Sequence, residues 1–382
     1  MSDDLLSPEE LQFRDSVHSF VEREIVPNAT KWDLGERYPR ELFPVFADLG
    51  WMGVAVPEEF GGSGGGSVLY AILCRELARG SAAIALGLYV HTALAIPGIY
   101  LLGNDEQRKR WLPAALKGEK IGCWAYAEAG SGSDVSAVST RAREDGNGWV
   151  LQGSKLYITN ATFADFMIVV ASTNPEQGLK GLSMFIVEAD NPGVSVGAPM
   201  NKLGMGASEM GEIVLDDCRL PADALLGPAE GGFIKALKVL VLGRIAASGF
   251  SVGLGRAALE EATGYTRQRV QFGKPISGHQ AVRHALVDAR TKLQACRHML
   301  YHATGLAQAD RPCSVETSMA KLFVAETAVQ IALTCQQVMG AYGLSEGHAM
   351  ERHVRDLLGM PIVGGSSNMQ RNNIANRLGL AS

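Results

Sequence analysis

The chain has 382 residues, more than one ordinary hydrophobic core accommodates, so we expect two or three packed units that share a large interior. It carries 35 lysine and arginine residues against 40 acidic residues, which gives a formal charge of −5. This balance provides neither a basic footprint for nucleic acid nor a polybasic membrane anchor, so we expect neither partner. The acidic N-terminus and the lack of an uninterrupted apolar run of about 18 residues favour a cytoplasmic protein.

The first hundred-odd residues have the pattern of α-helices. Ser7-Pro8-Glu9-Glu10 has the form of a capping box with proline at the first helical position, and apolar residues follow at helical spacing. The same spacing occurs over residues 42–49 and again after the glycine-rich loop 61–66, as far as about Lys117. We therefore predict an N-terminal helical domain over residues 1–118.

Short β-branched and aromatic runs replace this pattern between about residues 120 and 226. Turn residues bound each run, which predicts an antiparallel sheet or a small barrel, and we assign residues 119–226 to a middle β-domain. Long helical stretches return from Gly232 onward and predict a C-terminal helical domain over residues 227–382. The order helices, strands, helices indicates an α+β chain that is mostly α and argues against alternating βαβ units.

Cysteine spacing gives no sign of a disulfide framework or a zinc site. The six cysteines have no close pairs, which is typical of buried, reduced thiols. They are Cys74, Cys123, Cys218, Cys296, Cys313 and Cys335. Glu346, His348 and His353 also lack a known ligand spacing, so we predict no metal site.

Three segments stand out, and the first and third carry residue types suited to binding a phosphorylated cofactor. The loop Tyr126-Ala-Glu-Ala-Gly-Ser-Gly-Ser-Asp134 consists of small residues, which let backbone N–H groups approach a phosphate closely. Lys155-Leu-Tyr-Ile-Thr-Asn160 has good strand propensities. Arg267-Gln-Arg-Val-Gln-Phe-Gly-Lys-Pro-Ile-Ser-Gly-His-Gln280 contains arginines, whose planar fork suits a diphosphate.

These segments resemble the signatures of the FAD-dependent acyl-CoA dehydrogenase superfamily, in family order and spacing. Gln337-Val-Met-Gly-Ala-Tyr-Gly343 and Met350-Glu-Arg-His-Val-Arg-Asp356 complete the resemblance, which covers essentially the whole chain. It implies three domains: a helical N-domain, a middle β-barrel or sheet domain and a C-terminal four-helix bundle, with FAD and an acyl-CoA thioester between them. Tyr157 replaces a usual tryptophan, Ala341 replaces a usual glycine, and Ala127 replaces a usual hydroxyl residue.

The resemblance also implies which residues bind cofactor and substrate. The expected FAD contacts are Tyr126, Ala127, Gly132, Ser133, Tyr157, Ile158, Thr159, Arg269, Gln271, Phe272, Gln280, Gln337, Gly340, Ser366 and Asn368. In relatives the segment at Gln337 reaches the flavin of a neighbouring subunit, which implies a homodimer or homotetramer. Ser133 and Arg244 are the expected substrate contacts, and an electron-transferring flavoprotein is an expected partner.

The residue that removes the substrate α-proton is missing from both of its usual places. Most relatives carry a glutamate where this chain has Gly364, which we call the loop seat, and other branches carry it at Gly243, the helix seat. A positioned base contributes about 10²–10⁴ in rate, so we expect poor dehydrogenation of simple straight-chain acyl-CoAs. His91 is a candidate for a displaced base, because it falls where the N-domain should line the acyl pocket and imidazole titrates near neutral pH.

Several functions remain open at this stage. The chain could oxidise acyl-CoA with a displaced base, or catalyse a base-free reaction similar to that of sulfinopropionyl-CoA desulfinase, although Leu86 stands where that enzyme has its substrate arginine. It could also be a flavin monooxygenase or the non-catalytic subunit of a heteromeric dehydrogenase. A scaffold protein without cofactor is a further class, but the intact Thr159, Arg269, Phe272 and Gln280 count against it.

Overall fold

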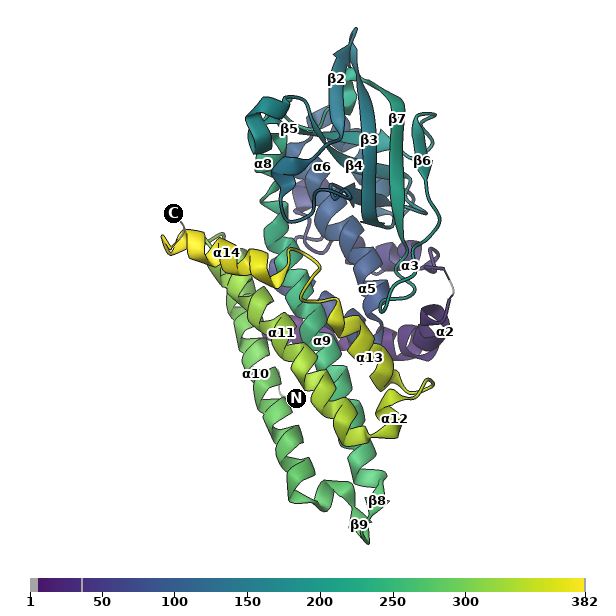
Figure 1. The fold of residues 1–382 in the computed structure, drawn as a ribbon, viewed down its shortest axis with the longest axis vertical. Coiled ribbons are helices and arrows are strands. Elements are labelled where there is room, and N and C mark those ends of the chain that lie inside the picture. Colours follow the sequence, from purple (N-terminus) through teal and green to yellow (C-terminus); the bar gives the residue numbers. More distant parts are fainter. Residues whose placement is uncertain (1–5, 36, 381–382) are drawn as a thin grey trace.

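Helices from the two ends of the chain pack together below a β-sheet in the computed structural model, which describes residues 6–35 and 37–380 (Figure 1). The N-terminal helices are α1 (Pro8–Phe20), α2 (Ala29–Asp33), α3 (Leu42–Asp48), α4 (Gly66–Gly80), α5 (Ala82–Tyr89), α6 (Ile96–Leu102) and α7 (Asp105–Leu116). The predicted capping box is confirmed, because Ser7 Oγ accepts from Glu10 N at 3.2 Å and Glu10 accepts from Ser7 N at 2.8 Å. The acidic residues 1–5 lie outside the described residues.

The middle part of the chain forms one curled sheet. Its strands are β1 (Gly122–Ala125), β2 (Arg141–Asp145), β3 (Gly148–Thr159), β4 (Phe166–Ser172), β5 (Leu182–Glu188), β6 (Val194–Val196) and β7 (Met210–Pro221). The strand order is β1-β4-β2-β3-β7-β6, and β5 pairs with β4. The prediction of an antiparallel sheet is wrong for two strand pairs, because β2 runs parallel to β4 at one register position and β1 runs parallel to β4 along its length. The β2–β3 hairpin between them provides the crossover that a parallel pair needs, and residue patterns do not reveal strand direction.

The C-terminal part is a bundle of long helices. Its elements are α8 (Gly232–Ala236), α9 (Val239–Gln268), the hairpin of β8 (Val270–Gln271) and β9 (Lys274–Pro275), α10 (Gln280–Gln308), α11 (Ser314–Met339), α12 (Ala341–Leu344), α13 (Ala349–Leu358) and α14 (Ser367–Arg377). Helix α9 packs against α4, α10 and α11, so it joins the N-terminal helices to the bundle. The predicted three-part, mostly helical α+β fold is confirmed.

Three helical segments are long and apolar enough to cross a membrane by length and composition. They are Ala82–Leu102, Val239–Gln268 and Ser314–Met339. The most apolar stretches of these segments are 100%, 72% and 44% buried inside the fold. Packing against other helices therefore explains the apolar composition of the first two.

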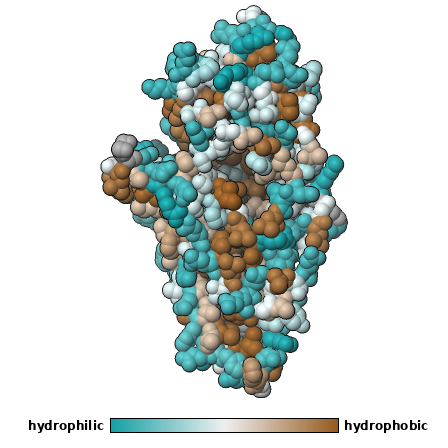
Figure 2. Space-filling view, viewed as in Figure 1, coloured by the Kyte–Doolittle hydropathy of each residue, from teal (hydrophilic) through white to brown (hydrophobic). Residues whose placement is uncertain are grey.

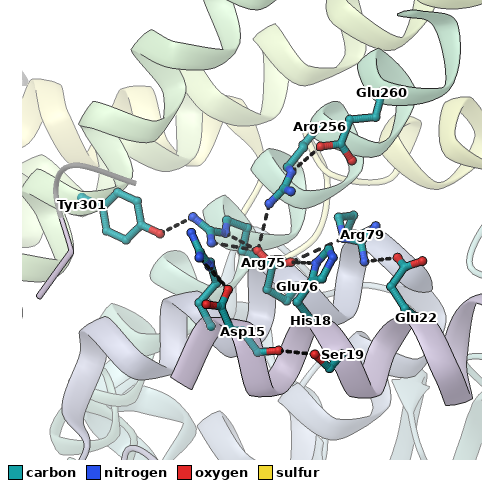
Figure 3. Close-up of polar contacts among 11 residues, drawn as sticks. Asp15, His18, Ser19, Glu22, Arg75, Glu76, Arg79, Arg256, Glu260 and Tyr301 are labelled. Carbon is teal, nitrogen blue, oxygen red and sulfur yellow. Dashed lines mark hydrogen bonds and ion pairs between the residues drawn. The ribbon is translucent and has the colours of Figure 1, made fainter. Parts of the chain in front are cut away.

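A buried carboxylate ties four helices together (Figure 3). Glu76 on α4 contacts Arg75 at 2.8 Å, Arg256 at 3.2 Å and Arg79 at 3.4 Å, and His18 Nδ1 lies 3.1 Å from its second oxygen. Burial alone would raise the pKa of Glu76, but the hydrogen bond from His18 and the three guanidinium charges hold it well below its ordinary value. The carboxylate thereby links α1, α4 and α9, and Arg75 extends the network to Tyr301 on α10 at 2.5 Å.

Candidate functional site

The loop after β1 and the end of β3 lie side by side. Leu156 N donates to Ala127 O at 2.9 Å, and Lys155 Nζ donates to Glu128 Oε1 at 2.7 Å and to Tyr126 O at 3.4 Å. Tyr126 and Ala127 are therefore neighbours of the 155–159 segment. The structure brings these two groups of expected flavin contacts together.

Glu128 fixes the shape of the small-residue loop from within. One of its oxygens accepts from Ser139 N and Oγ at 2.7 and 2.6 Å, and the other accepts from Thr140 N and Oγ1 at 3.0 and 2.6 Å. Burial alone would raise the pKa of Glu128, but these hydrogen bonds and the one from Lys155 lower it to about 2. A side chain added at Gly130 or Gly132 would meet only open space, so the loop presents its backbone outward.

Tyr157 is held in an unusual conformation beside this loop. Its φ is +60°, and its side chain is 61% exposed although the flanking Ile158 is buried. The β3–β7 register shifts between Lys155 and Ile158, and such bulges redirect side chains. Strained, exposed aromatic residues at a strand end are typical of functional sites. Thr159, half-buried, follows at the end of the strand.

A hydrogen bond joins the end of β3 to the apolar segment Ala82–Leu102. The side chain of Asn160, which is buried and has a φ of +68°, donates to Gly87 O at 2.8 Å. Tyr89 and His91 follow on the same segment. Hydrophobic side chains gather in the middle of the face shown in Figure 2, below the sheet.

His91 is enclosed by backbone groups. Its Nε2–H donates to Ala115 O at 3.0 Å and its Nδ1 accepts from Gly122 N at 2.9 Å, so both nitrogens are occupied. Burial lowers the pKa of His91 to about 4, and its ring packs against Phe43 and Phe166. This geometry offers no nitrogen to a substrate proton, so it gives the displaced-base hypothesis for His91 no support.

The helix seat and the loop seat lie along the same stretch of α9. A Cβ built on Gly364 would be 3.6 Å from Ala247 Cβ, and Ala247 lies one helical turn beyond Gly243. Gly364 has a φ of +68°, a left-handed backbone angle that favours glycine at the loop seat. Arg244, half-buried, is adjacent to the helix seat. The structure therefore brings Gly243, Gly364 and Arg244 together.

Tyr89 lies against the helix seat, a position that residue patterns do not predict. A Cβ built on Gly243 would be 3.0 Å from Tyr89 Oη. Tyr89 is 8% exposed, and its ring packs edge-on against Phe250 at 5.7 Å. Burial raises the pKa of the Tyr89 phenol and the nearby Arg244 charge opposes that rise. Within a uniformly apolar segment, no spacing distinguishes Tyr89 from its neighbours.

Six further expected FAD contacts lie toward the opposite end of the molecule from the sheet (Figure 1). Arg269, Gln271, Phe272 and Gln280 are exposed at and after the β8–β9 hairpin, and Phe272 is 92% exposed. The rings of Tyr265 and Tyr342 lie 5.3 Å apart, so α12 packs near this end. Gln337 and Gly340, which are exposed immediately before α12, belong to the same region. A single chain does not bring these residues to Tyr157 and Thr159.

The last two expected contacts stand at the start of α14. Ser366 caps this helix by accepting from Met369 N at 3.3 Å, and Asn368 accepts from Arg371 at 3.4 Å. Ser133, the expected substrate contact, is exposed on the small-residue loop.

The described residues also include two surface cavities and six free cysteines. The cavities have volumes of about 240 and 390 Å³, and neither is lined by an expected contact residue. All six cysteines are buried, and each is a free thiol. Across residues 6–35 and 37–380, no group of three or more His, Cys, Asp or Glu side chains is placed to hold a metal ion.

Comparison with known proteins gives consistent matches along the chain. The family description "Acyl-CoA dehydrogenase, N-terminal domain" matches residues 7–119, its middle domain matches 123–218 and its C-terminal domain matches 230–379. An acyl-CoA dehydrogenase of Bacillus subtilis is 37% identical over 96% of this chain and 97% of its own length. A 3-(aryl)acrylate reductase of Clostridium sporogenes is 36% identical over the same shares of both chains. The solved structure of a glutaryl-CoA dehydrogenase from Mycobacterium smegmatis with FADH2 has a TM-score of 0.94, 32% identity, and coverage of 99% of this chain and 96% of that one.

Proposed function

The chain belongs to the acyl-CoA dehydrogenase family, and we propose that this FAD-dependent oxidoreductase acts on the α,β carbon–carbon bond of an acyl-CoA thioester with Tyr89 as the group that exchanges the α-proton. The observation that supports this assignment is the position of Tyr89 Oη, 3.0 Å from where a side chain at the helix seat would begin. The phenol oxygen therefore lies next to the helix seat, where other branches of the family carry a glutamate.

The residues of this chain fit FAD. The outward-facing backbone of the small-residue loop leaves room for a bulky ligand at Gly130 and Gly132, and the exposed, strained Tyr157 offers a ring face beside it. Thr159 adds a hydroxyl at the end of β3. When bound, FAD supplies the group that accepts or returns the hydride of the β-carbon.

We propose that two chains share each FAD. Tyr157 and Thr159 lie at the end of β3 in the sheet, whereas Arg269, Phe272 and Gln280 are exposed at the far end of the bundle (Figure 1). An exposed phenylalanine and arginine at that end suit contact with the diphosphate and adenine end of a cofactor held mainly by another copy. A homodimer or homotetramer then follows, and an electron-transferring flavoprotein is the proposed electron partner in a cytoplasmic setting.

Tyr89 is chemically suited to proton exchange at this position. Its hydroxyl lies 3.0 Å from the point where a side chain at Gly243 would begin, so it faces the position that the missing acid would occupy. Burial keeps the phenol protonated at neutral pH, which suits delivery of a proton to the α-carbon of an unsaturated thioester. By microscopic reversibility the phenolate removes that proton in the oxidative direction, and the Arg244 charge stabilises the phenolate.

The alternatives left open by the sequence are not favoured. The relatives described above are dehydrogenases and a reductase, so a desulfinase-like reaction, a flavin monooxygenase and a non-catalytic subunit have no comparable support. A reductase needs a proton donor for the α-carbon, and a Tyr89 phenol that is protonated at neutral pH can serve as that donor.

A pair of tyrosine variants tests the assignment. We expect Tyr89→Phe to retain FAD and bind acyl-CoA but to lose about 10²–10⁴ in the rate of flavin reduction by acyl-CoA and of reduced-flavin oxidation by enoyl-CoA. Tyr100→Phe, half-buried on α6 and stacked on Phe60, serves as the matched control and should keep the parent rate. Stopped-flow flavin absorbance measures both rates. An unchanged rate in Tyr89→Phe would overturn the role of Tyr89, whereas a parent that responds to no thioester would overturn the proposed function.

A further inference from the structure

Lys321 is a buried cation without a partner. Its side chain on α11 is 0% exposed, and its Nζ has no hydrogen-bond partner within the described residues. Burial lowers the pKa of Lys321 to about 8; the charge of Glu326 opposes this change and that of Arg244 adds to it. A buried ammonium group without an acceptor is costly, so a site that retains one is expected to receive an anion.

Arg244 is the second cation without a partner in this region. Helix α9, which carries it, packs along α11, which carries Lys321, and the Arg244 charge contributes to the lowered pKa of Lys321. Its half-buried guanidinium makes no hydrogen bond or ion pair with any described residue, and burial lowers its pKa. A glutamate at the adjacent Gly243 or at Gly364 would compensate these charges. The chain has neither acid, so the positive charge beside the two seats is uncompensated.

Further polar atoms without partners lie on α11 and on the neighbouring α14. Ser318 Oγ on α11, and Ser367 Oγ and Gln370 Oε1 on α14, are buried without hydrogen bonds. Helices α11 and α14 pack against each other. Gln370 Nε2 donates to Gly365 O at 2.9 Å, which connects α14 to the loop seat. Helices α11 and α14 thus hold buried polar atoms without partners, donors and acceptors alike, next to the loop seat.

The acid whose charge acts on Lys321, Glu326, is already engaged. Arg371 Nη2 donates to both carboxylate oxygens of Glu326, at 2.8 and 3.0 Å. These two bonds direct Glu326 toward Arg371 on α14, and none joins it to Lys321. The compensating anion is therefore expected to come with the ligand.

We propose that the acyl group of the substrate carries a carboxylate, which Arg244 and Lys321 bind beside the two empty seats. This inference rests on the proposed function, since it concerns the same acyl-CoA site. A carboxylate fits because its two oxygens can accept from a guanidinium fork and from an ammonium group together. An uncharged acyl chain would leave both cations without an acceptor.

Three matched pairs of acyl-CoAs test the proposal on the FAD-loaded protein. Each pair compares a carboxylate-bearing group with an uncharged group of similar size: methylmalonyl with isobutyryl, succinyl with butyryl, and glutaryl with valeryl. We expect at least one carboxylate-bearing thioester to bind about 10- to 100-fold more tightly than its uncharged counterpart, as measured by calorimetry. Equal or weaker binding by all three carboxylate-bearing thioesters would overturn the proposal, and this comparison does not depend on any variant folding.

Lysine variants locate the preference. Lys321→Met should abolish the preference for the carboxylate-bearing thioester and should leave the dissociation constant of the uncharged thioester within about twofold of the parent value. Lys321→Arg should restore part of that preference. Lys292→Met, exposed on α10, is the matched control and should keep the full preference. A preference that survives both Lys321→Met and Arg244→Gln would contradict the assignment to these residues. Flavin reduction by the same thioesters reports the proposed function separately, because it requires redox chemistry and not a charge preference.

Discussion

At the scale of single residues, two neighbours on one apolar segment have different surroundings. His91 attracts attention in a sequence because imidazole titrates near neutral pH, yet its two nitrogens are bound to Ala115 O and Gly122 N. Tyr89 looks like an ordinary core residue, yet its hydroxyl faces the helix seat. Whether an ionisable group is available for chemistry depends on its hydrogen-bond partners, and these come from other parts of the chain.

Replacement of His91 should affect stability rather than catalysis. His91→Ala leaves Gly122 N–H and Ala115 C=O without a partner in the core and also creates a cavity. We expect a loss of about 2–5 kcal/mol in the free energy of unfolding, measured in urea. The rate of flavin reduction per FAD-loaded molecule should remain within about threefold of the parent. A stable variant with a rate reduced by about 10² or more would instead identify His91 as the base.

The pH dependence of the two reaction directions should differ if Tyr89 exchanges the proton. Burial raises the pKa of this phenol above its ordinary value near 10, so Tyr89 is protonated throughout the neutral range. Oxidation of acyl-CoA requires the phenolate and should accelerate about tenfold per pH unit from about pH 7 to 9, whereas enoyl-CoA reduction should stay flat. Stopped-flow rates across this range are the measurement. A carboxylate base would already be ionised and would give an oxidation rate independent of pH.

At the scale of elements, the contact of α5 with α9 decides how a restored acid can be accommodated. The helix seat appears open in the sequence, but a Cβ on Gly243 would lie 3.0 Å from Tyr89 Oη. The next atoms, Leu94 Cδ2 and Tyr89 Cε2, would be 3.8 and 3.9 Å away. The loop seat has more room, but its φ of +68° penalises any side chain at Gly364. The phenol oxygen is therefore the main obstacle at the helix seat.

Gly243→Glu should consequently work best when combined with Tyr89→Phe. Removal of the hydroxyl clears the close contact, and the Arg244 charge should help to keep the new carboxylate ionised. We expect the double variant to dehydrogenate acyl-CoA at least about tenfold faster than Tyr89→Phe alone. Gly364→Glu in the same background is the comparison and should recover less, with lower stability. If every variant folds, retains FAD and binds thioesters but none regains activity, the missing acid is not what distinguishes this protein from its relatives.

At the scale of the whole molecule, the expected FAD contacts divide between two ends. The sheet end holds Tyr126, Tyr157 and Thr159, and the hairpin end holds Arg269 and Phe272 (Figure 1). The exposed residues at the hairpin end are available to contact the cofactor of a second copy of the chain. Between these ends, the buried Glu76 network links α1, α4 and α9 (Figure 3).

Loss of Arg269 should therefore weaken FAD retention and leave the rest of the chain intact. Arg269→Ala removes a charge-assisted contact to the diphosphate, which we expect to raise the FAD dissociation constant about 10- to 100-fold. Arg283→Ala, exposed on the first turn of α10, is the control for charge alone. Flavin content after gel filtration and the mass from light scattering are the measurements. Full flavin occupancy in Arg269→Ala, or a monomer with full occupancy in the parent, would contradict a shared cofactor.

The sequence by itself determined the order of helical and β parts, the capping box at Ser7 and the absence of an acid at Gly243 and Gly364, because each depends on residues close together along the chain. Family motifs added the expected FAD contacts, whose roles remain predictions, as do the domain boundaries at 118 and 226. Only the tertiary structure placed Tyr89 against Gly243. Periodicity shows which face of a helix is buried, but not which distant residue packs against it. For the same reason, the parallel pairing of β1 with β4 and the missing partner of Lys321 required the folded chain.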